Sequence, residues 1–286
     1  MQASGVTWDT HTSKMIPFLA SSLTFVAYIT ATALLVARLR RLARGLNASR
    51  WPPLVSAAAG LAIHTWILSA TVFGPRGIHL GLFNAASLIA WQIVLLLLLA
   101  STRRRVENLG LMVLPLAAAV VLVGPLVAGT QPVPEHSDWR VDAHILVSVL
   151  AFSLLALAMA QAILLSVQER SLRHHQPGGF IRALPPLQTM EDVLFQMLWT
   201  GFVLLSLALA SGLLFVHNLV AQHLVDKTVL SFAAWLVFGI LLFGRWRFGW
   251  RGRIAVRWTM GGGVALILAY FGSKFVLEML LGKSWG

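Results

Sequence analysis

The sequence predicts an all-α protein, a polytopic bundle of about eight transmembrane helices. Hydrophobic residues make up 58% of the 286 residues and charged residues only 11%, whereas soluble domains carry about 25% charged residues. A water-soluble fold cannot bury this much apolar surface, so an integral membrane protein is the class that fits. The apolar runs are continuous and lack the alternation of a membrane barrel, which indicates helices.

Eight apolar runs reach or approach the roughly 20 residues that a helix needs to cross a bilayer. They consist mainly of Leu, Ala and Val with scattered Gly, and no soluble domain fits between them. We therefore expect one integral membrane domain over residues 1–286. The predicted spans are residues 16–37, 52–73, 80–101, 109–128, 143–167, 193–216, 228–244 and 255–277.

The first run is expected to be a retained helix rather than a signal peptide. The segment before it is polar and carries a single basic residue, Lys14, so it lacks a cationic leading region. No small-residue cleavage site followed by a soluble domain comes after it.

The loop charges predict the orientation. Most of the 22 Lys and Arg residues fall in alternate loops, and the intervening loops carry few. Basic loops stay in the cytoplasm, and an even number of helices puts both termini on the same side. We therefore expect both termini on the non-cytoplasmic side. The basic loops contain Arg38, Arg40, Arg41, Arg44, Arg50, Arg103, Arg104, Arg105, Arg170, Arg173, Arg182, Arg245, Arg247, Arg251, Arg253 and Arg257.

The segment before the sixth span contains a helix-start signal. Pro185 and Pro186 suit the turn that precedes a helix, and residues 189–192 offer a Thr cap followed by acidic residues. We expect the sixth helix to start with this Thr189 cap.

Composition also excludes several functional classes. The chain has no Cys, so disulfides, Cys-ligated zinc, iron–sulfur clusters and covalent haem attachment are excluded. The net charge of +12 needs no nucleic-acid partner, because loop arginines of a membrane protein account for it. No carboxylates pair inside a predicted span, which argues against a proton-coupled transporter. Zinc-protease, phosphate-loop and dinucleotide motifs are missing.

Five of the nine histidines lie in or beside the predicted spans. His64 is about twelve residues into the second span, roughly 18 Å from the basic side. His79, His144, His217 and His223 lie at the outer ends of spans. Haem iron takes two axial ligands, and imidazole is a common one, so histidines at one membrane face favour a haem site. The alternatives are a hydrogen-bonded core role for His64 and interfacial roles for the other four.

Two further residues could contribute to that site. Trp139 and Arg140 come just before His144 on the outer side. The indole could contact the edge of a cofactor, and the guanidinium of Arg140 or Arg76 could lie near a haem propionate.

Several segments resemble the cytochrome c assembly family of the CcsA/HemX type, and most closely its YpjD-like branch. The resemblance spans roughly residues 55–277 and rests on segments in the family's order. The segments are IHTWILS, LFNAASLIAW, WRVDAHILVSVLAFSLLALA, LPPLQTMEDVLFQMLWTGFVLLSLALASG and GWRGRIAVRWTMGGGVALILAYFG.

The resemblance implies a haem-handling protein of the bacterial inner membrane. It implies that His144 is an outer axial ligand, that His64 is an intramembrane ligand, and that His223 lies where the family presents haem. The chain departs from the family because residues 215–227 contain no Trp. A His expected near the end of the next helix is also missing, and Phe243 and Gly244 stand there.

The leading hypothesis is therefore non-covalent haem binding near the outer membrane face, in cytochrome c assembly or a related haem-linked function. Its partners would be membrane lipid and haem-maturation or other inner-membrane proteins. Binding or transfer of haem is expected rather than an enzymatic reaction. The alternatives are a non-haem accessory or scaffold protein of an inner-membrane complex and a small-molecule transporter.

Overall fold

The computed structural model describes residues 10–74, 77–78, 81–127, 139–173, 181, 183–215 and 225–272. Its helices are α1 (Thr10–Ala43), α2 (Trp51–Thr71), α3 (Leu82–Arg103), α4 (Gly110–Val127), α5 (Trp139–Arg173), α6 (Leu187–Phe215), α7 (Val225–Phe248) and α8 (Gly252–Ile267). A 3-10 turn, η1 (Glu107–Leu109), precedes α4, and a π-helical turn, η3 (Leu268–Gly272), follows α8.

The predicted fold class is confirmed, because the described part of the chain contains eight helices that are long and apolar enough to cross a membrane. The described strands, β1 (Phe73–Gly74) and β2 (Gly77–Ile78), have two residues each and pair antiparallel after α2. Many large apolar side chains face outward. Leu116 is 65% exposed and Leu214 is 68% exposed, as expected where lipid rather than water surrounds a bundle.

Several helices extend beyond the apolar runs, because polar and charged residues continue the helix past the hydrocarbon core. One such helix is α6, which begins at Leu187 rather than at residue 193. The amide of Met190 donates to the carbonyl of Pro186 at 3.1 Å, so helical bonding starts directly after the proline pair. The predicted Thr189 cap is therefore wrong, since Thr189 lies inside the first turn.

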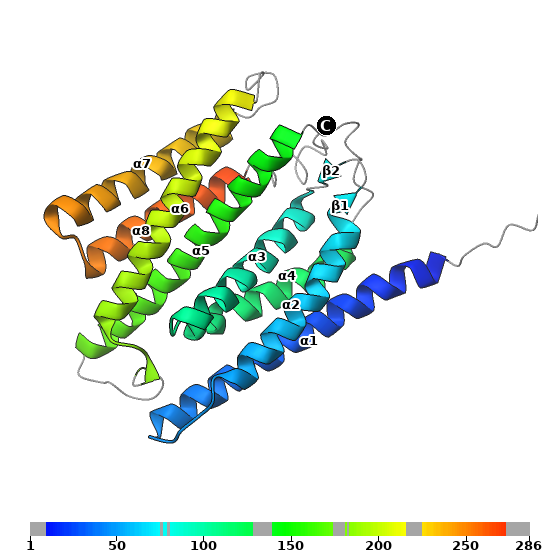
Figure 1. Cartoon of the computed structure of the whole chain (residues 1–286), viewed down its shortest axis with the longest axis horizontal. Helices are drawn as coiled ribbons and strands as arrows, with labels where there is room; N and C mark the ends of the chain where they lie inside the picture. The colour runs from blue at the N-terminus through cyan, green and yellow to red at the C-terminus, as the bar shows by residue number, and fades with distance from the viewer. Residues whose placement is uncertain are drawn as a thin grey trace, which may run out of the picture.

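The eight helices form two four-helix units. In the first unit, α1 and α3 each pack against α2 and α4. In the second unit, α5 and α7 each pack against α6 and α8. Each unit is thus a closed ring of helices, and the two units lie side by side (Figure 1).

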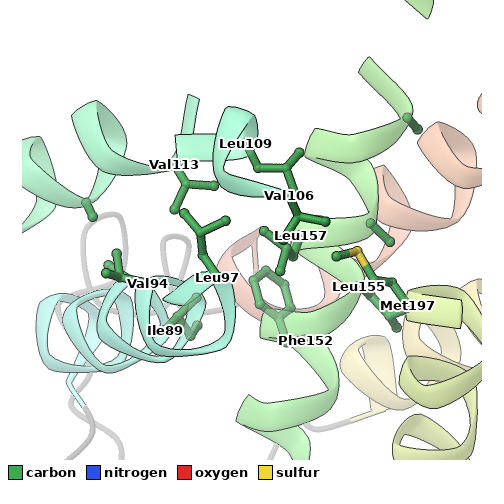
Figure 2. Close-up of a cluster of buried hydrophobic side chains, with 14 of the residues drawn as sticks. Ile89, Val94, Leu97, Val106, Leu109, Val113, Phe152, Leu155, Leu157 and Met197 are labelled. Atoms are coloured by element: carbon green, nitrogen blue, oxygen red, sulfur yellow. The ribbon is translucent and has the colours of Figure 1, made fainter. Parts of the chain in front are cut away.

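The two units meet chiefly where α3 packs against α5. Buried Leu97 of α3 and Val106 lie beside buried Leu157 and Phe152 of α5, as Figure 2 shows. The Ser153 hydroxyl donates to Gln92 Oε1 at 3.0 Å across the same junction. A polar bond of this kind fixes the register of two helices whose apolar surfaces are otherwise alike.

The described residues of the predicted basic loops lie at one end of the bundle, which we call the arginine-rich end. There α1, α3, α5 and α7 end, and α2, α6 and α8 begin. Carboxylates link the second unit at this end. Glu169 accepts a 2.7 Å bond from Arg173 and lies 3.7 Å from Arg253, and Glu191 accepts a 2.7 Å bond from the Gly252 amide.

Candidate functional site

His144 lies at the end of the bundle opposite the arginine-rich end, about 8 Å along α5 from Trp139. Its ring is partly buried against α6. Nδ1 is 2.8 Å from the hydroxyl of Ser211, which is on α6. Nε2 is 3.5 Å from the hydroxyl of Ser148, one turn further along α5. One ring nitrogen is therefore held tightly and the other only weakly.

The Ser211 contacts favour one tautomer of the neutral His144 ring. The Ser211 hydroxyl donates its hydrogen to the carbonyl of Ala208 at 3.0 Å, so it meets His144 as an acceptor. With the hydroxyl oriented in this way, Nδ1 is the N–H group of the neutral ring. The lone pair is left on Nε2, the nitrogen with the long contact. This arrangement is typical of a metal-binding histidine whose other nitrogen is oriented by a hydrogen bond.

Gly212 allows the ring to approach α6. A Cβ atom at this position would lie 3.0 Å from His144 Cε1, which is closer than ordinary van der Waals contact. The glycine next to Ser211 therefore lets the imidazole come close enough to α6 to reach the Ser211 hydroxyl.

Arg140 lies on the same face of α5 as His144, because the two residues are four apart in a helix. Its guanidinium lies 5.9 Å from the centroid of the Trp139 ring. Trp139 is 72% exposed. The sequence-predicted pair thus lies one turn beyond His144, toward the end of the bundle, where a cation can meet an anionic group in water.

His64 occupies a different environment, in the first unit. It is fully buried about 10 Å from the end of α2. Nδ1 is 3.2 Å from the hydroxyl of Tyr28 on α1, and Nε2 is 2.9 Å from the hydroxyl of Ser87 on α3. Both nitrogens are engaged, so His64 links three helices of the unit.

Gly60 makes room for this link. It lies one turn before His64 on α2, and a Cβ atom there would be 2.7 Å from Cε1 of Tyr28. The Tyr28 ring therefore packs directly on the α2 backbone, which brings its hydroxyl to His64.

The seven candidates thus separate into groups. His144, Arg140 and Trp139 lie together on α5, while His64 lies in the other unit, hydrogen-bonded to Tyr28 and Ser87. The remaining three candidates, His79, His217 and His223, lie outside the described residues. Within the described ranges, no group of three or more His, Asp or Glu side chains could hold a metal ion.

Sequence reasoning missed Ser211, Ser87 and Tyr28. The two serines lie in apolar helices beside other small residues, and nothing in the local pattern separates them from ordinary helix serines. The sequence does contain a signal for Tyr28. It is one of only two Tyr residues in the chain, and a buried hydroxyl in an apolar helix requires a hydrogen-bond partner.

The donor set at α5 and α6 is compatible with haem ligation. Histidine is one of the axial ligands that proteins use for haem iron, and Nε2 of His144 combines a lone pair with a weak contact. His64 is less suited in this arrangement, because a ligand bond would displace either Tyr28 or Ser87.

The fold and these contacts define a polytopic helical membrane protein with a histidine site at one end of its second four-helix unit. A family model described as "Cytochrome C assembly protein" matches residues 51–281. The chain therefore belongs to the cytochrome c assembly protein family.

Two similar proteins extend this result. The inner membrane protein YpjD of Escherichia coli K12 is 32% identical over 264 residues, which cover 90% of this chain and 97% of that protein. A protein of Azospirillum brasilense named for its place in the nifR3-like 5' region is 34% identical over 251 residues, covering 84% of this chain and 89% of that protein. No solved structure matches the chain. The chain is a multi-pass protein of the bacterial inner membrane.

Proposed function

We propose that this protein binds haem non-covalently through His144, at the end of the bundle formed by the start of α5 and the end of α6. The single observation that carries the proposal is the 2.8 Å contact between Nδ1 and the Ser211 hydroxyl. It leaves the Nε2 lone pair for the iron and holds the ring in one orientation before any ligand arrives.

The remaining residues have supporting roles in this proposal. Arg140 lies one turn beyond His144 and would meet a haem propionate, and Trp139 would cover part of the porphyrin edge. Haem bound there would supply an iron centre to which His144 and a second side chain could bind. His223 is the candidate for that second ligand, with His79 and His217 as further candidates predicted at the same face, whereas His64, in the other unit, would have to release Tyr28 or Ser87.

The biological role that we propose is haem handling in cytochrome c assembly or a related haem-linked process. Family membership supports it. We further propose that both termini and the His144 site face away from the cytoplasm, since the arginines gather at the opposite end. One integral domain is also proposed, because one continuous buried core includes residues of both units. Haem-maturation proteins are the proposed partners.

A scaffold role within an inner-membrane complex is the second candidate. The observation that favours it is the engagement of both His64 nitrogens by Tyr28 and Ser87. A histidine in that state stabilises helix packing and needs no cofactor.

The absorption spectrum of the purified protein tests the proposal. We expect a Soret band after expression with haem supply, and we expect His144→Ala to lose most of it. Ser211→Ala should keep the ligand but lower haem affinity by about tenfold to a hundredfold, the usual effect of removing a hydrogen bond that orients a ligand.

Ser206→Ala provides the matched control, because Ser206 is also on α6 and its hydroxyl also binds a ring N–H group, Trp235 Nε1, at 2.8 Å. It should leave the Soret band unchanged. A protein that stays colourless after haem loading would contradict haem binding, and an unchanged spectrum in His144→Ala would contradict the assigned ligand.

A further inference from the structure

A cleft at the arginine-rich end separates the two four-helix units. Arg104, Arg105 and Asn108, which follow α3, line one side of it. Gln161 of α5 and Thr189 of α6 line the other side. The enclosed volume is about 30 Å³, enough for one small polar group. The cleft lies at the opposite end of the bundle from His144, so it is separate from the proposed haem site.

Polar atoms that lack partners lie in and beside this cleft. Asn108 is only 5% exposed, and its side-chain oxygen has no hydrogen-bond partner among the described residues. Gln168 is equally buried. Its Nε2 donates to the carbonyl of Pro185, a residue that lines the cleft, and its Oε1 has no partner within the described ranges. A buried acceptor without a donor costs roughly 1–3 kcal/mol. The floor of the cleft therefore requires a hydrogen-bond donor.

The mouth of the cleft offers hydrogen-bond donors, whereas the floor offers acceptors. Arg104 and Arg105 are exposed, and neither forms an ion pair within the part of the chain that the structure describes. Guanidinium groups bind phosphate oxygens with paired, charge-assisted hydrogen bonds. The ligand should therefore carry a phosphate outside and a hydrogen-bond donor inside.

The deeper lining adds a third requirement. Leu109, Leu164 and Val193 continue the cleft between the helices, and Leu109 belongs to the buried cluster at the junction of the units (Figure 2). This apolar lining suits the methylene groups of a headgroup, while the acyl chains, which are attached through the phosphate, would remain at the mouth among the membrane lipids. Basic sites between helices on the cytoplasmic side commonly bind lipid headgroups.

We propose that this cleft binds a phospholipid whose headgroup ends in a primary ammonium, as in phosphatidylethanolamine. The phosphate binds Arg104 and Arg105, and the ammonium donates to Asn108. Two methylene groups separate these charges in the headgroup, so a single headgroup carries both the anion for the mouth and the donor for the floor. The lipid would link η1 with the start of α6 and stabilise the contact between the two units.

Native mass spectrometry of the purified protein with defined lipids tests this assignment. Phosphatidylethanolamine and phosphatidylcholine with identical acyl chains are the decisive pair, because the trimethylated ammonium of choline cannot donate a hydrogen bond from nitrogen. We expect the wild-type protein to retain the ethanolamine lipid about tenfold better, the effect of one charge-assisted hydrogen bond.

Two variants separate the contribution of Asn108 to lipid binding from that of the two arginines. Asn108→Leu should abolish the preference for ethanolamine over choline. The double variant Arg104→Gln/Arg105→Gln should lower retention of both lipids by about tenfold. Arg103→Gln is the matched control, since Arg103 is exposed and adjacent in sequence but does not line the cleft. It should behave like the wild type.

Several outcomes would overturn the proposal. Equal retention of the two lipids by the wild-type protein would exclude ammonium recognition, and this comparison stands even if Asn108→Leu fails to fold. Stronger retention of phosphatidylglycerol than of phosphatidylethanolamine would show that the site recognises anionic charge alone. Equal thermal stabilisation by water-soluble phosphoethanolamine would exclude a lipid as the specific ligand. Equal losses of lipid retention in Arg103→Gln and in the double variant would show that lipids are attracted nonspecifically to the arginine-rich end.

Discussion

At the scale of single residues, two histidines in one chain illustrate two uses of the same side chain. His64 is fully buried, and both of its nitrogens have close hydroxyl partners, Tyr28 and Ser87. His144 is partly buried, with one close partner and one distant one. The number of strong hydrogen bonds, rather than the depth in the membrane, therefore distinguishes a packing histidine from a candidate ligand.

Removing the Tyr28 hydroxyl tests the role of His64. Tyr28→Phe leaves Nδ1 of His64 without a partner, and we expect it to lower the free energy of unfolding by about 1–2 kcal/mol. Thermal unfolding in detergent, followed by tryptophan fluorescence, measures the change. Ser22→Ala on the same helix is the control, because the Ser22 hydroxyl binds only the Phe18 carbonyl of its own helix. Equal shifts in both variants would contradict a special role for the Tyr28–His64 contact.

At the scale of helices, close approach depends on glycine at a few positions. Gly60 lets Tyr28 of α1 pack on α2, and Gly212 lets His144 of α5 pack on α6. In a bilayer such contacts matter more than hydrophobic burial between helices, because lipid tails are as apolar as leucine. A glycine on the neighbouring helix therefore permits both the Tyr28–His64 contact in the first unit and the His144–Ser211 contact in the second.

Gly60→Ala should separate α1 from α2. The added methyl group would lie 2.7 Å from the Tyr28 ring, and overpacking of this kind costs about 1–3 kcal/mol. We expect a lower melting temperature in the same unfolding experiment. Gly261→Ala in α8 is the control, since a Cβ there meets no atom within 4 Å. A Gly60→Ala protein as stable as the control would contradict the close packing of Tyr28 on α2.

At the scale of the whole molecule, hydropathy alone predicted all eight spans, because the bilayer requires a long apolar run for each helix. It could not predict which helices pack together, since faces rich in Leu and Ala look alike in sequence. Ser211 is 67 residues from His144, and Tyr28 is 36 residues from His64. These pairs arise only from the ring-like arrangement of each unit, so the candidate ligands could be predicted but not their partners.

The orientation of the bundle in the membrane has a direct test. The chain contains no cysteine, so single cysteines can be introduced without background. Trp139→Cys should react with a membrane-impermeant maleimide in spheroplasts, because the proposed site faces away from the cytoplasm. Arg44→Cys at the arginine-rich end should react only after the membrane is permeabilised. Mass-shift gels measure both reactions, and the reverse pattern would contradict the proposed orientation.

The arrangement in two rings also has a consequence for biosynthesis. Every helix pair that closes the first ring lies within α1 to α4, which leave the ribosome before α5. These four helices can therefore assemble in the membrane while the second half of the chain is still being translated. The surface of α3 that contacts α5 would then already be in place when the second ring forms.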